Sequence, residues 1–425
     1  MIKKMLFLLL SMSMIQAVPL IDTITVDRNE LIVVVNHHFK KQYLKSDFFV
    51  RYHDDIVLAD LDESLLIVPF LLNVITIIWA SGHVYTIPAL DYELWRSLEV
   101  VKNVFKNLYP HTKWNGAVVP ERLVSHDFTF NASGVAHMFS NGLDSICSSL
   151  VHRDESQLLI TVQGHADTPL NNDGVWATIR AEACNFAQRY GFSNAFLSSN
   201  YYDILKRRAL HHLSPEISHW RTAAVEGLGW IGLTIPLLIC KGYNHLRIAS
   251  SISWECPFAH AANPFIDNAI RCAGVRVEHD GFEYSRVQKC NVLKKCLEKS
   301  NEPRPRIRVC VESKNATNCC VCIKCLQTIH CLWAVGLDHK AYGFDCDDHV
   351  IITALRAQLQ KRFSRFKLWH FECIQAFLTE KQENGDALSD YLTWFLHYDF
   401  SQHVKKERKQ HPRIDWRAFS NMIYE

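Results

Sequence analysis

Six consecutive residues form a Gly/Ser/Asp segment that could bind an oxyanion through its backbone N–H groups and serine hydroxyls: Ser140, Asn141, Gly142, Leu143, Asp144 and Ser145. They follow a strand predicted over Gly134–Phe139 and begin a predicted helix, so their backbone N–H groups would lie at the positive end of a helix dipole. Gly142 can adopt a positive φ angle, and Asn141 tolerates one better than most non-glycine residues. The serine hydroxyls can donate to phosphate oxygens, whereas Asp144 would hold a magnesium ion or brace the loop. The pattern predicts a phosphate-binding loop, and the alternative is a chance Gly/Ser/Asp turn.

A second group of residues has the spacing of a metal site. Six of the 15 cysteines lie between Cys310 and Cys331, and four of them read C-x8-C-x2-C-x2-C: Cys310, Cys319, Cys322 and Cys325. Four thiolates satisfy a tetrahedral Zn²⁺, and a closed four-cysteine site implies a structural rather than a catalytic metal. The alternative is a set of buried cysteines without a metal, which gain nothing from clustering. The spacing therefore predicts a zinc knuckle over residues 310–325.

The composition is that of a folded protein with balanced charge. The chain has 425 residues, of which 48% are hydrophobic and 21% charged. This excludes a disordered or collagenous protein and allows about two or three domains. The formal net charge of +2 gives no support to a DNA-coating protein, although a local basic patch is compatible with it. We therefore expect no stable binding to DNA.

The patterns of short strands and helices divide the chain into three parts. Residues 21–122 are expected to form a separate N-terminal α/β domain of unknown role. Residues 131–335 repeat the order strand, loop, helix, strand, which is typical of a doubly wound, mainly parallel sheet. Residues 336–425 have helical spacing and form a predicted helical C-terminal extension. In the first part the predicted elements are strands at Ile32–Val35, Ile56–Leu61 and Val84–Ile87 and a helix over Tyr92–Leu108.

Residues 1–20 bear on the cellular compartment in which the protein is expected. Lys3 and Lys4 precede the apolar run Met5–Leu10, and the small residue Ala17 lies near a possible cleavage site. This order of charged, apolar and small residues is the pattern of a signal peptide. The alternative is a buried N-terminal segment. Because clustered metal-binding thiolates suit a reducing compartment, we expect a cytoplasmic protein, with a secreted protein as the alternative.

Two further apolar runs are shorter than a transmembrane helix. Ser64–Ala80 contains a proline and an asparagine, and Gly227–Cys240 is shorter still. Since a spanning helix needs about 20 apolar residues, both runs are predicted to be buried core elements. We expect no membrane span.

The loop and the cysteine spacing together resemble a known family. SNGLDS resembles the SGGxDS signature of the PP-loop ATP pyrophosphatases (adenine nucleotide alpha hydrolase-like), with Asn141 in place of the usual glycine. A PP-loop at the start of a doubly wound domain, with C-x8-C-x2-C-x2-C at its end, resembles the 7-cyano-7-deazaguanine synthase family. NCCVCIKC (318–325) looks like that family's CGxCxxC core, and NPFID (263–267) and YSRVQK (284–289) look like two further family segments.

The resemblance covers residues 131–335, about half of the chain. Members of the family are shorter and lack an N-terminal region of this size and a helical tail. The chain therefore looks like a relative of the synthase rather than the synthase itself.

The resemblance implies a fold of the HUP type and an ATP-dependent reaction. Family members cleave ATP between its α and β phosphates with Mg²⁺, activate a small-molecule carboxylate as its adenylate, and join it to ammonia in a C–N bond on the queuosine route. It implies catalytic roles for Asp144, Ser145 and Lys289, with Lys289 facing the phosphates. Apart from the resemblance, Asp267, Asp280 and Arg286 lie near one another in the sequence and are candidates to bind Mg²⁺ or substrate, with surface polar roles as the alternative. His165, beside Asp167 in the loop after the next strand, could contact adenosine or metal or brace the loop. The oligomeric state stays open, with a homodimer as one option.

Two alternatives belong to other classes. Another PP-loop chemistry would thiolate or amidate a tRNA base or a small acid, with Cys147, Cys256 or Cys272 carrying sulfur. Asn141 could instead mark a decayed loop, which would leave a zinc-stabilised nucleotide-binding module without turnover.

Overall fold

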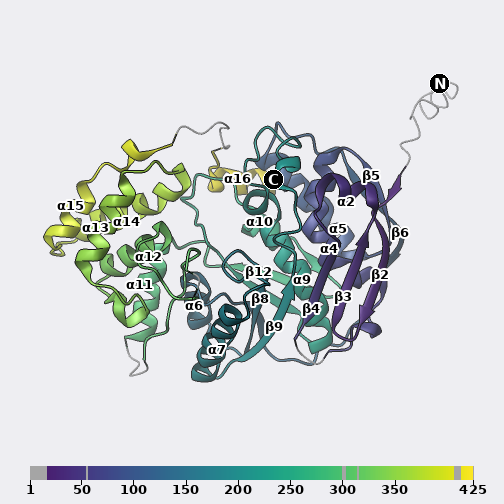
Figure 1. Cartoon of the computed structure of the whole chain (residues 1–425), viewed down its shortest axis with the longest axis horizontal. Coiled ribbons are helices and arrows are strands. Elements are labelled where there is room, and N and C mark those ends of the chain that lie inside the picture. Colours follow the sequence, from purple (N-terminus) through teal and green to yellow (C-terminus); the bar gives the residue numbers. More distant parts are fainter. Residues whose placement is uncertain (1–16, 54–55, 299–302, 314, 406–412, 425) are drawn as a thin grey trace.

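The computed structural model describes residues 17–53, 56–298, 303–313, 315–405 and 413–424. In this part of the chain a nine-stranded sheet forms the centre, and helices cover its two faces (Figure 1). The strand order is β11-β12-β10-β7-β8-β9-β4-β3-β2. The bounds of these strands, in chain order, are β2 Ile21–Asp27, β3 Glu30–Val35, β4 Phe48–Tyr52, β7 Val135–Met138, β8 Gln157–Gln163, β9 Ser193–Ser199, β10 His245–Ala249, β11 Arg271–Cys272 and β12 Val275–Asp280.

The five middle strands of this sheet are parallel. From β7 the chain adds β8 and β9 on one side, and then returns to add β10 and β12 on the other side. This reversal between β7 and β10 creates a crevice at the carboxyl ends of the strands, where ligands of such sheets bind. The prediction of a mixed α/β chain with a mainly parallel sheet is confirmed.

The two faces of the sheet contact different cores. In β8, Leu158 and Ile160 belong to one apolar core, whereas Leu159 between them belongs to the other, because successive side chains of a strand point to opposite faces. The first core contains α4 Val68–Ser81, α5 Tyr92–Leu108 and α9 Glu226–Lys241. The second contains α6 Leu143–Val151, α7 Asp173–Tyr190, α11 Arg286–Leu297, α12 Ile323–Ala334, α13 Asp348–Leu359, α14 Arg365–Glu383 and α15 Asp390–His397.

The N-terminal region shares the main sheet, although we expected it to form a domain of its own. Strand β4 pairs antiparallel with β9, with Val50 opposite Ser199 and Tyr52 opposite Leu197. Helix α4 packs along α9 within the first core. Because α4 is apolar on all sides, it needs partners on every side, and α9, from beyond residue 122, is its most extensive one. The sheet therefore continues across the boundary expected near residue 122.

Smaller elements complete the N-terminal region. A second sheet of three parallel strands lies beyond α4 and α5. Its strands and the nearby short helices are β1 Val18–Pro19, β5 Val84–Asp91, β6 Ala117–Val124, α2 His37–Tyr43, α3 Glu63–Leu66 and α8 Arg207–Leu210. The predicted strand Ile56–Leu61 is wrong, since residues 58–60 form a 3-10 turn. The reason is local: Asp62 caps α3 by accepting from the Ser64 N–H, which turns the chain directly after this segment.

Both long apolar runs are buried, as predicted. The helical stretch Arg221–Lys241, which includes α9, has the length and hydropathy to cross a membrane, but 83% of its apolar window is buried inside the protein. Helix α4 is buried along nearly its whole length. Helices α4 and α9, which these runs form, therefore help to bury each other's apolar side chains.

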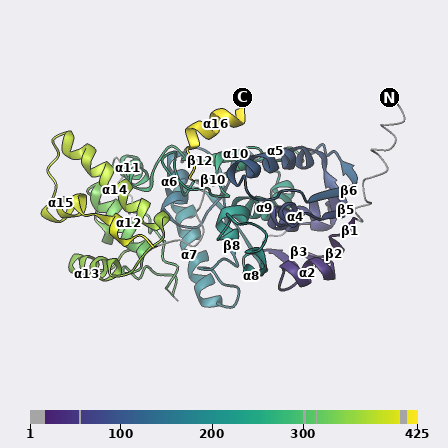
Figure 2. The ribbon, with the colours of Figure 1, turned by 90° about the horizontal axis from the view of Figure 1, so that it is seen from above.

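The end of the chain returns to the first core. Helix α16 Trp416–Tyr424 leaves the group α11–α15 and lies beside α10 Pro264–Asp267 (Figure 1, Figure 2). The Trp416 ring stacks on Phe265 with 5.9 Å between ring centroids. The expected signal-like residues 1–16, part of the linker before Cys310 and most of the basic segment 405–413 lie outside the described residues.

Candidate active site and metal centre

A cavity of about 330 Å³ lies where the order of the parallel strands reverses. Met138 at the end of β7 and Ile248 and Ala249 at the end of β10 line it. The loops that follow β7 and β8 form its rim, as the topology requires. The crevice expected from the strand order is therefore a real cavity of a size suited to a small ligand.

The predicted phosphate-binding loop forms one wall of this cavity. Ser140, Gly142, Leu143, Asp144 and Ser145 all line it. The Ser140 Oγ accepts from the Gly142 N–H at 3.2 Å, and the Ser145 Oγ donates to the Gly142 carbonyl at 3.1 Å. These bonds fold the loop over the start of α6. No side chain among the described residues caps the N-terminus of α6, so its first N–H groups are left for a ligand.

Asn141 stabilises the loop without lining the cavity. Its φ angle is +58°, the left-handed conformation that we predicted Asn would tolerate. It does not line the cavity: its side chain is buried, and its carbonyl accepts from the Arg308 N–H at 2.8 Å. Asn141 thus takes the place of a glycine by its conformation.

Asp144 contacts two cationic side chains, of which one lines the cavity and the other does not. Its Oδ1 lies 3.2 Å from Lys289 Nζ, and its Oδ2 lies 3.8 Å from the Arg286 guanidinium. Burial would raise the pKa of Asp144, but Lys289 and Arg286 lower it, so the carboxyl is ionised. Lys289 also donates to the Ser250 carbonyl and is not a lining residue. It therefore braces Asp144 in this structure, whereas we expected it to face the phosphates. Arg286 lines the cavity.

Two cations that line the cavity were not identified from the sequence. Lys324 comes from α12, and Arg308 comes from the segment before Cys310. Arg308 donates to Asp167 Oδ2 at 2.8 Å and to the Ser140 carbonyl at 3.0 Å. The only available signal was their position, since Lys324 lies between two of the cysteines and Arg308 lies two residues before the first.

A chain of charged side chains continues from Arg308. His165 Nδ1 lies 2.5 Å from Asp167 Oδ1, and its Nε2 lies 3.8 Å from Glu226 Oε1. Burial lowers the pKa of His165, but Asp167 and Glu226 more than compensate and raise it. Burial likewise opposes ionisation of Asp167, and hydrogen bonding to His165 together with Arg308 drives its pKa far down. His165, Asp167 and Glu226 all line the cavity.

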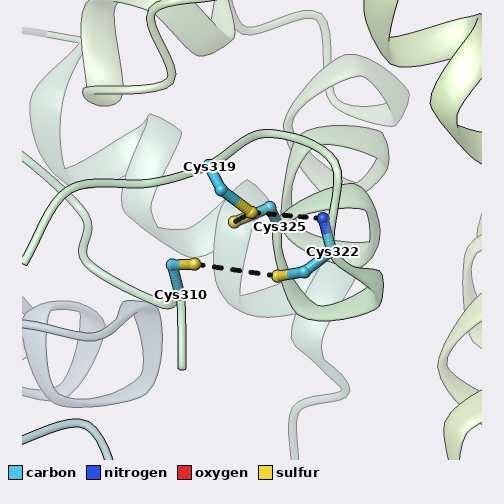
Figure 3. A group of neighbouring side chains, drawn as sticks. All are labelled: Cys310, Cys319, Cys322 and Cys325. Carbon is cyan, nitrogen blue, oxygen red and sulfur yellow. Dashed lines mark hydrogen bonds between the residues drawn. The ribbon is translucent and has the colours of Figure 1, made fainter. Parts of the chain in front are cut away.

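The four predicted cysteines meet at one point beside the cavity. Their Sγ atoms all lie within 4.8 Å of one another, and Figure 3 shows them converging from the loop and from the start of α12. The Sγ–Sγ distances are 3.9 Å for Cys310 and Cys322 and 4.0 Å for Cys319 and Cys325. A tetrahedral zinc ion with bonds of about 2.3 Å requires sulfur atoms about 3.8 Å apart. The cluster therefore fits such an ion and could hold one.

Backbone groups around the cluster favour thiolates. The N–H of Ser313 donates to Cys310 Sγ, and the N–H of Cys322 donates to Cys319 Sγ, both at 3.3 Å. Within the cluster, the interaction with Cys325 lowers the pKa of Cys322, whereas burial raises the pKa of Cys319 to about 11 and the interaction with Cys322 raises the pKa of Cys325. Deprotonated sulfur is the form that binds a metal.

The remaining candidates lie away from the cavity. Cys147, Cys256 and Cys272 are buried, and burial raises the pKa of the first two to about 12 and raises the pKa of Cys272 well above its usual range. None of them is a lining residue. Thiols in such surroundings are poor nucleophiles, so the sites considered for sulfur transfer do not suit that role.

Comparison of the chain with protein-family models, with curated proteins and with solved structures gave no match.

Proposed function

We propose that the protein is an ATP-dependent enzyme of the PP-loop type that adenylates a substrate carboxylate, releases pyrophosphate and forms a C–N bond. The observation that carries the proposal is the position of the SNGLDS loop. It lines the cavity at the strand-order reversal, at the uncapped N-terminus of α6, together with Arg286 and Lys324. The resemblance to the 7-cyano-7-deazaguanine synthase family and its HUP-type fold belongs to the same proposal.

Phosphates would bind at the loop. The N–H groups of α6 and the hydroxyls of Ser140 and Ser145 supply neutral donors, and Arg286 and Lys324 supply positive charge. Within the part of the chain that the structure describes, the one ion pair of Asp144 Oδ2 is the 3.8 Å contact with Arg286, so this carboxylate oxygen is suited to a magnesium ion that also contacts phosphates. Mg²⁺, when bound, would neutralise charge on the leaving pyrophosphate.

Catalysis would then depend mainly on how the cavity positions the substrate carboxylate against ATP. A substrate carboxylate oxygen attacks the α-phosphorus of ATP, the bond to the β-phosphate oxygen breaks, and pyrophosphate leaves. Ammonia next attacks the acyl carbon and releases AMP, giving an amide and a proton. In a second activation, the amide oxygen would attack the α-phosphorus of another ATP and release pyrophosphate; AMP would then leave with that oxygen and the nitrogen would lose its protons, which gives a nitrile. The cavity contributes fixed cations and N–H donors, which stabilise charge as it develops.

The four-cysteine site would act through structure. Arg308 lies two residues before Cys310, and Lys324 lies between Cys322 and Cys325. A zinc ion that ties these cysteines together would therefore fix both cations at the cavity. This is the role expected of a closed four-thiolate site.

The alternatives remain distinguishable from this proposal. Thiolation by a cysteine of the chain is disfavoured, since the three candidate thiols are buried and have raised pKa values. A decayed binding module would bind ATP without turnover.

The test is pyrophosphate release by zinc-loaded protein with ATP, Mg²⁺ and ammonium, measured across 7-carboxy-7-deazaguanine and a panel of other carboxylates. We expect release that depends on a carboxylate and is lost in Ser145→Ala and Asp144→Ala. Asn141→Gly should retain it, because glycine adopts the same φ angle. ATP binding without turnover in the wild type, with turnover restored by Asn141→Gly, would instead establish the decayed module.

A further inference from the structure

Positive charge gathers at the surface where two short helices meet. Lys41 belongs to α2 and Lys45 follows it, whereas Arg207 and Arg208 begin α8. All four residues are exposed, and we call them the α2–α8 patch. Within the part of the chain that the structure describes, none of the four forms an ion pair, although the neighbouring Lys40 pairs with Asp47. The charge of the patch is therefore available to a partner.

Hydrogen bonds between the two segments hold the patch together. Lys206 Nζ donates to the Lys41 carbonyl at 2.6 Å, at the C-terminal end of α2. The Lys45 N–H donates to the Ile204 carbonyl at 2.7 Å, and the Lys206 N–H donates to the Tyr43 carbonyl at 2.8 Å. Figure 2 shows α8 beside α2. Because these bonds join segments that are far apart in the sequence, the patch is a fixed feature of the fold.

The patch adjoins the cavity through Tyr202. The Arg207 guanidinium lies 5.5 Å from the centre of the Tyr202 ring. The centroids of the Tyr202 and His165 rings are 4.6 Å apart, and His165 lines the cavity. A molecule bound on the patch would therefore lie at the rim of the cavity, on the side of the loop that follows β8.

The character of the patch favours a protein partner over a nucleic acid. Nucleic-acid surfaces combine an extended track of cations with aromatic side chains that stack on bases. The net charge of the whole chain is only +2, and no exposed large apolar side chain lies in residues 36–46 or 203–212. Asp203 is exposed shortly before Arg207. A phosphate backbone has no positive group to pair with this aspartate, whereas a protein segment can place a lysine opposite it.

We propose that the α2–α8 patch binds an acidic segment of a partner protein. Glutamate and aspartate side chains of that segment pair with the cations of both helices at once. Because charge rather than an apolar anchor drives the binding, salt weakens it. This goes beyond the proposed enzymatic function, since it places a partner protein at the cavity rim and requires no step of the reaction.

The test is fluorescence anisotropy of the full-length, zinc-loaded protein with a labelled peptide of glutamate and serine residues that carries a single lysine. We expect saturable binding at low ionic strength that weakens as sodium chloride is added. Arg207→Glu combined with Arg208→Glu should lower the affinity about tenfold, because attraction becomes repulsion. Lys41→Glu combined with Lys45→Glu tests the other segment independently and should lower the affinity by a similar factor.

The control reverses two exposed cations elsewhere, with Arg96→Glu and Lys106→Glu on α5. Figure 2 shows α5 at the edge of the molecule opposite α8. This variant changes the net charge by the same amount as each patch variant, and its affinity for the peptide should stay within about twofold of the wild type. Circular dichroism and urea unfolding would establish that each variant is folded.

Three results would overturn the proposal. The first is that folded wild type does not bind the peptide, and the second is that the control loses as much affinity as the two patch variants. The third is tighter binding of an RNA hairpin of the same net charge that is lost in the patch variants, which would assign the patch to nucleic acid. Failure of the proposed enzymatic function is a separate result, because pyrophosphate release is measured without the peptide.

Discussion

The guanidinium of Arg308 contacts Asp167 at 2.8 Å while its other nitrogen donates to the Ser140 carbonyl at 3.0 Å. One side chain therefore joins the phosphate-binding loop after β7 to the loop after β8. Its own position is set by the segment that leads to Cys310. Arg308 thus links the cavity to the cysteine cluster, as Lys324 does from between Cys322 and Cys325.

Replacing this residue by lysine should uncouple the two loops. Arg308→Lys keeps the charge, but an ammonium group cannot span both acceptors in the fixed fork geometry of a guanidinium. We expect ATP affinity to fall about tenfold and the free energy of unfolding to fall by about 2 kcal/mol. Arg306→Lys, two residues away and paired with Glu182 outside the cavity lining, is the control in calorimetry and urea unfolding. Equal effects of the two substitutions would contradict the linking role.

Removal of one cysteine should release the metal. In Cys322→Ser a closed four-thiolate set becomes a three-thiolate set, which binds zinc more weakly. We expect zinc content, measured by mass spectrometry after dialysis, to fall from one ion per chain to well below it, together with a lower melting temperature. Cys184→Ser, on the exposed side of α7, should retain the full zinc content. A Cys322→Ser protein that keeps one zinc per chain would show that the cluster is not the site.

Stability should depend on pH through His165. Its pKa is raised in the folded protein by Asp167 and Glu226, so its contribution is complete below the ordinary histidine value of about 6.5 and disappears as the pH rises through the raised value. Asp167 has a strongly lowered pKa and remains ionised over this range. In urea unfolding, His165→Asn should therefore be clearly less stable than the wild type at pH 5.5 and closer to it at pH 9. The exposed His212→Asn should show no such trend. A constant difference for His165→Asn across this range would refute the assignment.

The contact between α4 and α9 should tolerate no added atom at Gly232. A Cβ there would lie 2.8 Å from Leu72 Cβ and 3.0 Å from the Val68 carbonyl oxygen, and the latter belongs to backbone that cannot move freely. Gly232→Ala should lower the free energy of unfolding by about 1–3 kcal/mol, despite the better helix propensity of alanine. Gly174→Ala, whose Cβ would meet nothing nearer than 3.7 Å, is the helical control. A neutral Gly232→Ala would mean that the two helices are less closely packed than described.

Local patterns predicted most of the elements. The helix over Tyr92–Leu108 agrees with α5 at both ends, because its apolar spacing is unambiguous and Asp91 caps it. The spacing of the four cysteines predicted a cluster that the structure brings together. Asn141 adopts the positive φ angle that its residue type allows.

Contacts between residues far apart in the sequence could not be predicted from local patterns. The pairing of β4 with β9 joins residues about 150 positions apart, and no local pattern specifies that partner. Lys289 was expected at the phosphates, but its place under Asp144 depends on how α11 packs against α6. Glu226 directly precedes the apolar run Gly227–Cys240, and only the tertiary fold brings it to the cavity beside His165 and His260.

The return of α16 to the first core has a consequence for how the protein is made. Trp416 and Phe419 belong to the core that also holds α4, α9 and the N-terminal strands, whereas most of the intervening residues from about 286 to 405 belong to the second core. Phe265 and Phe282, which pack on Trp416, therefore lack this contact on the ribosome until α16 has been synthesised. A nascent chain lacking the last helix would expose an aromatic surface, and such a surface is a natural target for chaperones.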